Sequence, residues 1–280
     1  MLKSFIKLRS TTAIIIVSII VSMGVSACNN DDSNNDEEET EKEEEKEEET
    51  VEFNNTILED YDGVVKAIET SNAITIDGLA NDDVWATEPW YGMNYKWMGS
   101  TPDTIDYYGK FKLAWDSENL YMLVEVVDDV LNPTLQDGVN NYWRGDYVEV
   151  FVDENQSGGD HKFNHQAFAY HISTEGHAID KNTAEETVFF DDHVDVVRTN
   201  ESNTYLWEIA LKLYDDTFDE NGENTPVSIL KGKKIGFSIA YGDNDGNKQR
   251  ENFMGSKSSH GINNDEGYTN SSVFGELTFE

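Results

Sequence analysis

Apolar and polar residues alternate along many short runs of this chain, and stretches rich in Asp, Asn, Gly and Ser separate the runs. A period of two predicts β-strands, and many short strands between turn sequences predict an all-β fold. Capping residues around Asp82 predict a helix of a turn or two at residues 81–87. We therefore expect residues 60–280 to form one domain, a two-sheet antiparallel β-sandwich that is immunoglobulin-like or jelly-roll-like. The predicted strands are residues 73–78, 110–116, 120–129, 147–155, 166–173, 188–197, 204–213, 235–243 and 274–280.

The run YVEVFV predicts a strand with two unlike faces. Its three valines would point to one side and form an ordinary core face. On the other side Glu149 lies between Tyr147 and Phe151, and the polar loop just upstream carries Trp143 and Arg144. A carboxylate among aromatic rings, beside a loop with tryptophan and arginine, is a candidate binding face.

The first residues have the layout of a secretory signal peptide, with a basic start, a short apolar run and small residues before Cys28. A cysteine at the cleavage position resembles a bacterial lipobox, in which that cysteine becomes the lipidated N-terminus. The alternative is a membrane-spanning helix, but the apolar run is shorter than the roughly 20 residues that a span needs. We predict a lipoprotein signal peptide at residues 1–27 and membrane attachment through a lipid on Cys28.

Residues 28–59 are dominated by Asp and Glu and contain almost nothing apolar until their last positions. Such a segment cannot bury a core, so we predict a disordered acidic tether. Acidic residues close behind a lipidated cysteine also resemble the signals that place some Gram-negative lipoproteins on the cell surface. We therefore expect an outer-membrane lipoprotein exposed on the cell surface; the alternative is a spacer without signal value.

The chain carries 56 acidic and 20 basic residues, a formal net charge of −36. This charge repels nucleic acid and anionic lipid, and it suits neutral ligands or divalent cations. Cys28 is the only cysteine, so its lipidation would exclude disulfides and thiolate sites. Motifs of zinc proteases, serine hydrolases and phosphate loops are missing from the sequence. Glycosidases use two carboxylates, but so many acids make such a pair uninformative, and we predict a binding protein rather than an enzyme.

The sequence DNDG offers Asp243 and Asp245 as candidate calcium ligands. Carboxylate oxygens are the ligands that calcium prefers, although the remaining spacing of an EF-hand is missing. The same four residues also make a good turn. We expect no required cofactor and a structural calcium ion as a plausible addition.

Trp143 is the tryptophan that packing explains least, because its loop is polar, whereas Trp85, Trp115 and Trp207 lie among apolar neighbours and are predicted to be core. A pyranose ring has apolar C–H faces and hydroxyl-rich edges. A sugar site therefore needs aromatic plates with carboxylate, amide or guanidinium groups at the edge. Trp143 with Glu149 and Arg144 offers both; the alternative is an aromatic cap over the edge of the sandwich.

Five segments in order resemble the family 9 carbohydrate-binding modules, β-sandwich sugar binders related to DOMON domains and often attached to xylanases. They cover the chain from about Ile74 to Glu280. The segments are ITIDGLANDDVW, KLAWDSENLYMLVEVVDDVLN, YWRGDYVEVFVDEN, TYLWEIALKL and SVFGELTF. The resemblance implies non-catalytic binding of an oligo- or polysaccharide, of the glucan or xylan class and often at reducing ends. It implies a role in polysaccharide capture alongside glycoside hydrolases, with bound calcium.

The resemblance also implies roles for individual residues. Trp143 would be one of two aromatic plates around the sugar ring, with Tyr268 as the second, and Glu149 would bind sugar hydroxyls. Asn264, or the neighbouring Asn263, would supply an amide, and Arg250 is a further candidate at the edge. The family carries an arginine where this chain has Ala169, with His171 or Gln166 as possible substitutes.

Two other functions remain open at this stage. Related sandwiches hold haem through methionine or histidine, and Met98, Met122 or Met254 with His171 or His260 could do so here. The sandwich could also serve as a surface adhesin that binds another protein through an apolar patch.

Overall fold

The computed structural model describes residues 54–247, 249–258 and 266–280, and nearly all of its regular structure is β-sheet. Sheet A contains β1 (Ile57–Leu58), β3 (Trp90–Gly92), β5 (Tyr107–Trp115), β6 (Leu120–Asp128), β12 (Thr204–Leu211) and β11 (Val194–Glu201). Sheet B contains β10 (Thr187–Phe189), β9 (Ala178–Lys181), β8 (Phe168–Ser173), β7 (Tyr147–Asp153), β13 (Lys234–Asp243), β15 (Gly275–Phe279), β14 (Asn252–Gly255) and β4 (Tyr95–Gly99). The helices are α1 (Asp83–Thr87) and three 3₁₀ turns, η1 (Val139–Arg144), η2 (Glu266–Tyr268) and η3 (Ser271–Val273).

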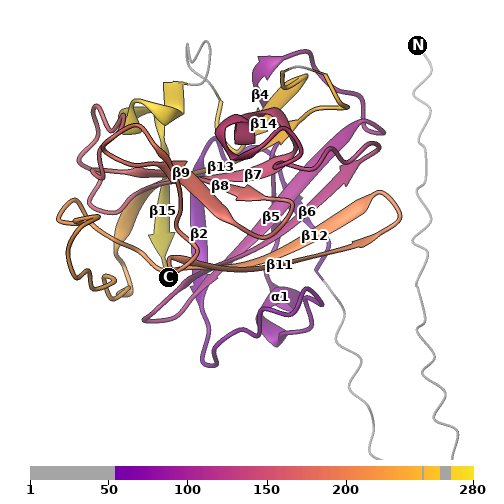
Figure 1. Cartoon of the computed structure of the whole chain (residues 1–280). Coiled ribbons are helices and arrows are strands. Elements are labelled where there is room, and N and C mark those ends of the chain that lie inside the picture. The colour runs from indigo at the N-terminus through magenta and orange to yellow at the C-terminus, as the bar shows by residue number, and fades with distance from the viewer. Residues whose placement is uncertain (1–53, 248, 259–265) are drawn as a thin grey trace, which may run out of the picture. The chain divides into compact units, whose positions relative to one another are not determined.

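The strand β2 (Val64–Glu69) joins the two sheets. Its first part pairs with β15 in sheet B and its last two residues pair with β5 in sheet A, both in parallel. Figure 1 shows β2 between β15 on one side and β5 on the other. The all-β sandwich is confirmed, and most of its strand pairs are antiparallel as predicted. The two parallel pairs of β2 and a third between β1 and β3 depart from that pattern.

The main core lies between the sheets and is built from the inward positions of both. The valines of β7 are buried there, as their alternation predicted. Aromatic contacts cross the interface, with Tyr107 of β5 stacked on Tyr241 of β13 at a centroid distance of 5.6 Å. Trp115 and Trp207 are buried in this core, as expected.

Each sheet also buries part of its outer face. On sheet A, residues 74–90, including α1, pack over the strands, and Trp85 is completely buried there. On sheet B, Trp97 and Phe253 of β4 and β14 pack with Phe151 of β7. A polar or aromatic residue that points outward from either sheet can therefore still be buried.

The alternating runs predicted the long strands well and the short ones poorly. Residues 73–78 are not a strand: the N–H groups of Asp77 and Gly78 donate to the Glu208 carboxylate instead of pairing in a sheet. Residues 188–197 are two strands, because a turn closed by a hydrogen bond from His193 N to Phe190 O separates β10 from β11. The predicted helix is α1, although Asp82 makes no side-chain capping bond.

The N-terminal predictions fall largely outside the described residues, including the signal peptide, Cys28 and most of the tether. The last part of the predicted tether is described, and it enters the fold. Ile57 of β1 pairs with Trp90 of β3 and packs against the apolar cluster outside sheet A. No helix within the described ranges combines the length and the apolar character needed to span a bilayer.

Candidate functional site

A cavity of about 360 Å³ lies on the outer face of sheet B. Its floor includes Ala169 and His171, the outward positions of β8, whose alternate residues Phe168 and Tyr170 are buried in the main core. The volume falls within the range of roughly 300–1,000 Å³ that small-ligand sites occupy. The register of sheet B therefore places a ligand-sized space directly over β8.

Four Trp, Tyr or Phe side chains stand in the cavity wall among the described residues: Tyr142 and Trp143 from η1, Tyr268 from η2 and Phe163 from the loop before β8. Trp143 is 37% exposed and Tyr268 is 42% exposed. Tyr142 supports Trp143 by an edge-on contact at 5.4 Å and makes a similar contact with His171 at 4.6 Å. Trp143 is not a member of the three buried apolar clusters among the described residues.

Glu149 of β7 lies below the floor of the cavity and is completely buried. It faces His171 across the β7–β8 ladder, and its Oε2 lies 3.4 Å from His171 Nε2 and 4.0 Å from Arg250 Nη1. Arg250 lies 4.4 Å from the ring centre of Phe253 and donates a hydrogen bond to the Tyr147 hydroxyl. The base of the cavity thus joins a carboxylate to a guanidinium and an imidazole.

Burial and the charge of Arg250 limit the positive charge at the bottom of the cavity. Burial, and to a smaller extent the positive charge of Arg250, lower the pKa of His171 to about 3. The imidazole is therefore neutral at physiological pH and can donate or accept one hydrogen bond at each nitrogen according to its tautomer. Arg250 supplies the positive charge beside Glu149.

The residues proposed from sequence are only partly brought together. Trp143, Tyr268 and Arg250 line one cavity, and Glu149 contacts its base through His171 and Arg250. Arg144 is not among the lining residues; its backbone carbonyl accepts a hydrogen bond from the Asn244 side chain. Gln166 is exposed and is not among the lining residues, and the prediction for Asn264 or Asn263 falls outside the described residues.

Several lining residues were not singled out by the sequence, among them Phe163, Asn164, Asp180 and Lys181. The loop that carries Phe163 has no periodicity, and Asp180 looks like an ordinary acid in a short strand. Phe163 has a φ of +55°, a backbone conformation that bulky residues rarely adopt. Strain of this kind is concentrated at functional sites and would have been visible only in a structure.

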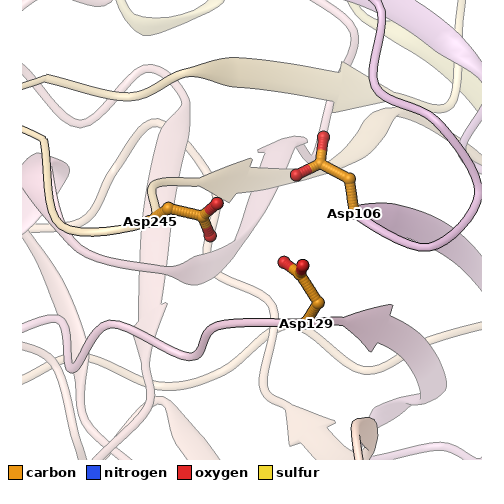
Figure 2. A group of neighbouring side chains, drawn as sticks. All are labelled: Asp106, Asp129 and Asp245. Atoms are coloured by element: carbon orange, nitrogen blue, oxygen red, sulfur yellow. The ribbon is translucent and has the colours of Figure 1, made fainter.

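A group of aspartates that are not among the lining residues of the aromatic cavity gathers where β5 begins and where β6 and β13 end. Figure 2 shows the carboxylates of Asp106, Asp129 and Asp245 turned toward one another. Each of these three residues offers an oxygen within 4.8 Å of the others, and Asp128, Asp243 and Asp245 form a second such set. The two aspartates of the DNDG sequence therefore join three others that come from distant parts of the chain.

The aspartate group fits a divalent cation. Asp243 is completely buried; its Oδ2 accepts a hydrogen bond from Asn252 at 2.5 Å, and its Oδ1 has no hydrogen-bond partner among the described residues. Burial, and then the charge of Asp128, raise the pKa of Asp243 to about 8. A hard cation with oxygen ligands, such as calcium, would supply the missing partner and offset the repulsion.

The methionines named for haem ligation do not converge on the cavity. Met122 is completely buried in the main core, whereas Met98 packs on the outer face of sheet B. Met254 also belongs to the main core, and no methionine is among the described residues that line the aromatic cavity. The haem interpretation gains no support from this arrangement.

Comparison with known proteins connects the cavity to a family. The model of the "Carbohydrate family 9 binding domain-like" family matches residues 76–280. Endo-1,4-beta-xylanase A of Thermotoga neapolitana is 38% identical over 94 residues, which are 34% of this chain and 8% of the relative. Exoglucanase XynX of Acetivibrio thermocellus is 29% identical over 175 residues, 62% of this chain and 14% of the relative. The chain thus spans a small part of these enzymes.

Solved structures show the same sandwich. A family 9 carbohydrate-binding module from Caldicellulosiruptor kristjanssonii in complex with glucose has a TM-score of 0.55 at 20% identity, and the match covers 77% of this chain and 95% of that one. The module from the same organism in complex with cellotriose has a TM-score of 0.55 at 21% identity, covering 78% and 93%. The structural likeness confirms the fold, and the family model matches most of the chain. The chain belongs to the carbohydrate family 9 binding domain-like family.

Proposed function

We propose that this domain binds the ring of a neutral sugar in the aromatic cavity and does not cleave it. One observation carries the proposal: the exposed ring of Trp143 borders a cavity whose base holds Glu149 and Arg250. An apolar plate beside charged hydrogen-bonding groups matches a ring with apolar faces and hydroxyl edges. Tyr268 and Phe163 offer further aromatic surface for the same ring.

The ligand belongs, in this proposal, to the glucans or xylans. The structural neighbours were solved with glucose and cellotriose, and the relatives in sequence are a xylanase and an exoglucanase. The cavity volume suits one or two sugar rings rather than a long chain lying flat. A small hydroxylated ligand gains little free energy per atom, so we expect a Kd of about micromolar to millimolar.

Isothermal titration of the purified protein with glucose, xylose, cellobiose, xylobiose and their alditols tests the proposal. Binding of a sugar but not of its alditol would identify recognition of the reducing end. Trp143→Ala should abolish this binding, whereas Phe189→Ala is a matched control, because Phe189 is an exposed aromatic residue that does not line this cavity. If the wild-type protein binds no sugar of the panel, the proposal is wrong.

We further propose that the domain is displayed on the outer membrane through a lipid on Cys28, with the acidic segment as its tether. The small residues before Cys28 and the acidic run behind it support this placement. Metabolic labelling with a fatty acid should mark the wild-type protein but not Cys28→Ser. Protease added to intact cells should remove the domain; full protection would place it inside the cell envelope.

We also propose that calcium binds the aspartate group, with Asp243 and Asp245 among its ligands. The buried, unpartnered Oδ1 of Asp243 supports this. Bound calcium would neutralise the group and tie the ends of β5, β6 and β13 together. The melting temperature should rise when calcium is added to chelator-treated wild type and stay unchanged in Asp243→Asn; an equal rise in both would place the ion elsewhere.

A further inference from the structure

Asp180 brings a second carboxylate to the aromatic cavity. It comes from the strand on one side of β8, whereas Glu149 comes from β7 on the other side. It lies on β9, which pairs with β8, and its half-buried side chain lines the cavity. The N–H of Lys181 donates to its Oδ1 at 2.7 Å, and the N–H of Ala169 donates to its Oδ2 at 3.2 Å. Two backbone bonds therefore hold the carboxylate in one place at the edge of the floor.

Those two bonds leave acceptor capacity. An ionised carboxylate has about four acceptor positions, and Asp180 uses one on each oxygen for the backbone. The neighbouring floor position is Ala169, whose methyl group is too small to cover the carboxylate. A ligand in the cavity can therefore reach Asp180 directly over Ala169.

Other polar residues of the wall are already engaged. Lys181 Nζ donates to Thr187 Oγ1 at 2.8 Å and to a backbone carbonyl of its own hairpin. The Asn164 side chain uses both its amide nitrogen and its oxygen in hydrogen bonds within its own loop. His161 Nε2 lies 2.7 Å from the Gly267 carbonyl. Asp180 differs from them because it is a fixed carboxylate with about two unused acceptor positions.

We propose that Asp180 is a specificity-determining residue of the cavity, which accepts hydrogen bonds from neighbouring hydroxyls of a neutral sugar; the inference rests on the proposed function of the same site. A carboxylate that is held rigidly accepts such bonds without losing side-chain entropy on binding. It also disfavours a ligand that brings its own carboxylate to that edge, so uronic acids should bind less well than neutral sugars.

This role makes sugar binding depend on pH. Burial raises the pKa of Asp180 to about 7, while the N–H bonds from Lys181 and Ala169 and the charge of Lys181 oppose the rise. The other charged or titratable groups around the cavity are Lys181, Arg250, Glu149 and the two histidines of the wall. Burial lowers the pKa of His161, as it does that of His171.

The sign follows from linkage. Hydroxyl donors favour the ionised carboxylate, so affinity is greatest above the pKa of Asp180 and falls as the pH drops through it. A group with a pKa near 7 is about 90% ionised at pH 8 and about 10% ionised at pH 6. We therefore expect Kd to rise about tenfold between pH 8 and pH 6.

The experiment is titration of the wild-type protein, Asp180→Asn and Asp195→Asn with glucose, or with xylose if that is the sugar bound, at pH 8 and pH 6. Asp195 is an exposed aspartate on β11 and serves as the matched control. Wild type and Asp195→Asn should lose affinity by about tenfold at the lower pH, whereas Asp180→Asn should bind more weakly at pH 8 and show a flat profile.

Monodeoxy sugars at pH 8 sharpen the result. Removing a hydroxyl that donates a hydrogen bond to Asp180 should weaken binding to wild type but not to Asp180→Asn. The comparison is a double-mutant cycle between protein and ligand. Independent deoxy effects, or a wild-type Kd that is equal at both pH values, would overturn the inference while the sugar still binds. No binding by wild type at either pH would instead reject the proposed function, and this inference with it.

Discussion

Two buried glutamates with similar sequence surroundings have different environments. Glu149 and Glu208 each lie in the middle of a long strand, point to the outer face of their sheet and are completely buried. Glu208 accepts four hydrogen bonds: from the N–H groups of Asp77, Gly78 and Ala80 and from the indole of Trp85. All four donors come from the segment that covers sheet A.

Glu149 has side chains of the cavity beside its carboxylate. The guanidinium of Arg250 and the neutral imidazole of His171 lie beside its carboxylate, and both side chains line the aromatic cavity. In the proposed function, an acid on the outer face of a sheet stabilises the fold where a loop lies flat on it and serves ligand binding where side chains leave a space. What covers the strand decides the role, and the strand sequence alone does not.

The largest expected effect is a loss of stability when the hydrogen bonds of Glu208 are removed. Glu208→Gln replaces one accepting oxygen with an NH₂ group, so about two N–H donors lose their acceptor. We expect the free energy of unfolding to fall by about 3 kcal/mol, because bonds to a buried charge are each worth about 1.5–3 kcal/mol. Urea denaturation measures the loss, and Kd for sugar should stay within twofold of wild type. A change in Kd without loss of stability would refute the structural role.

Next comes Trp143→Ala, which removes the exposed plate of the cavity. Loss of a stacking surface worth about 2 kcal/mol weakens binding roughly 30-fold, to the limit of detection for a weak sugar ligand. The free energy of unfolding should change by less than about 0.5 kcal/mol, because exposed residues contribute little to stability. Retained affinity in this variant would remove Trp143 from the site.

Glu149→Gln tests the functional glutamate directly. The amide keeps the shape but loses the charge beside Arg250, and we expect Kd to rise about tenfold. Stability should fall by only about 1 kcal/mol, because Arg250 keeps its bond to the Tyr147 hydroxyl. Calorimetry and urea denaturation on the same sample give the two numbers. A stability loss as large as that of Glu208→Gln would make the two glutamates equivalent and end the comparison.

The smallest effect concerns the strained wall residue. Phe163→Gly removes an aromatic surface and also relieves the left-handed backbone, which glycine adopts freely. We expect binding to weaken about threefold while the free energy of unfolding rises by roughly 0.5 kcal/mol. Phe163→Ala, which keeps the strain, should weaken binding equally without the gain in stability. Equal stabilities of the two variants would show that the backbone stores no strain.

Sequence reasoning succeeded where a property is local and periodic. The alternation in β5, β6, β7, β12 and β13 predicted those strands, since both faces of each strand follow from neighbouring residues. The short strands β9 and β14 were not predicted from alternation, because their pairing with neighbouring strands, rather than their own sequence, makes them strands. Residues 73–78 alternate like a strand, but the distant Glu208 takes two of their backbone donors.

The site divides in the same way. Trp143, Glu149, Arg250 and Tyr268 were reached through a polar loop, an unusual strand face and a family resemblance. Asp180 could not be predicted from the sequence, because its proposed role depends on the small side chain at position 169 of the neighbouring strand. The cavity exists only after several separate segments meet, and no single segment contains its pattern.

The position of β2 has a consequence for the order in which the molecule can assemble. Val64 of β2 pairs with Glu276 of β15. The two sheets are therefore joined through β2 only after β15 has formed its pairing with this early strand. Pairings between residues so distant in the chain make folding slow, because the entropy of closing a very long loop is lost before the contacts that stabilise it form. Nascent chain that lacks β15 leaves Leu277 and Phe279 out of the core and β2 with an open edge. Such intermediates would expose an unpaired strand edge until β15 has been synthesised.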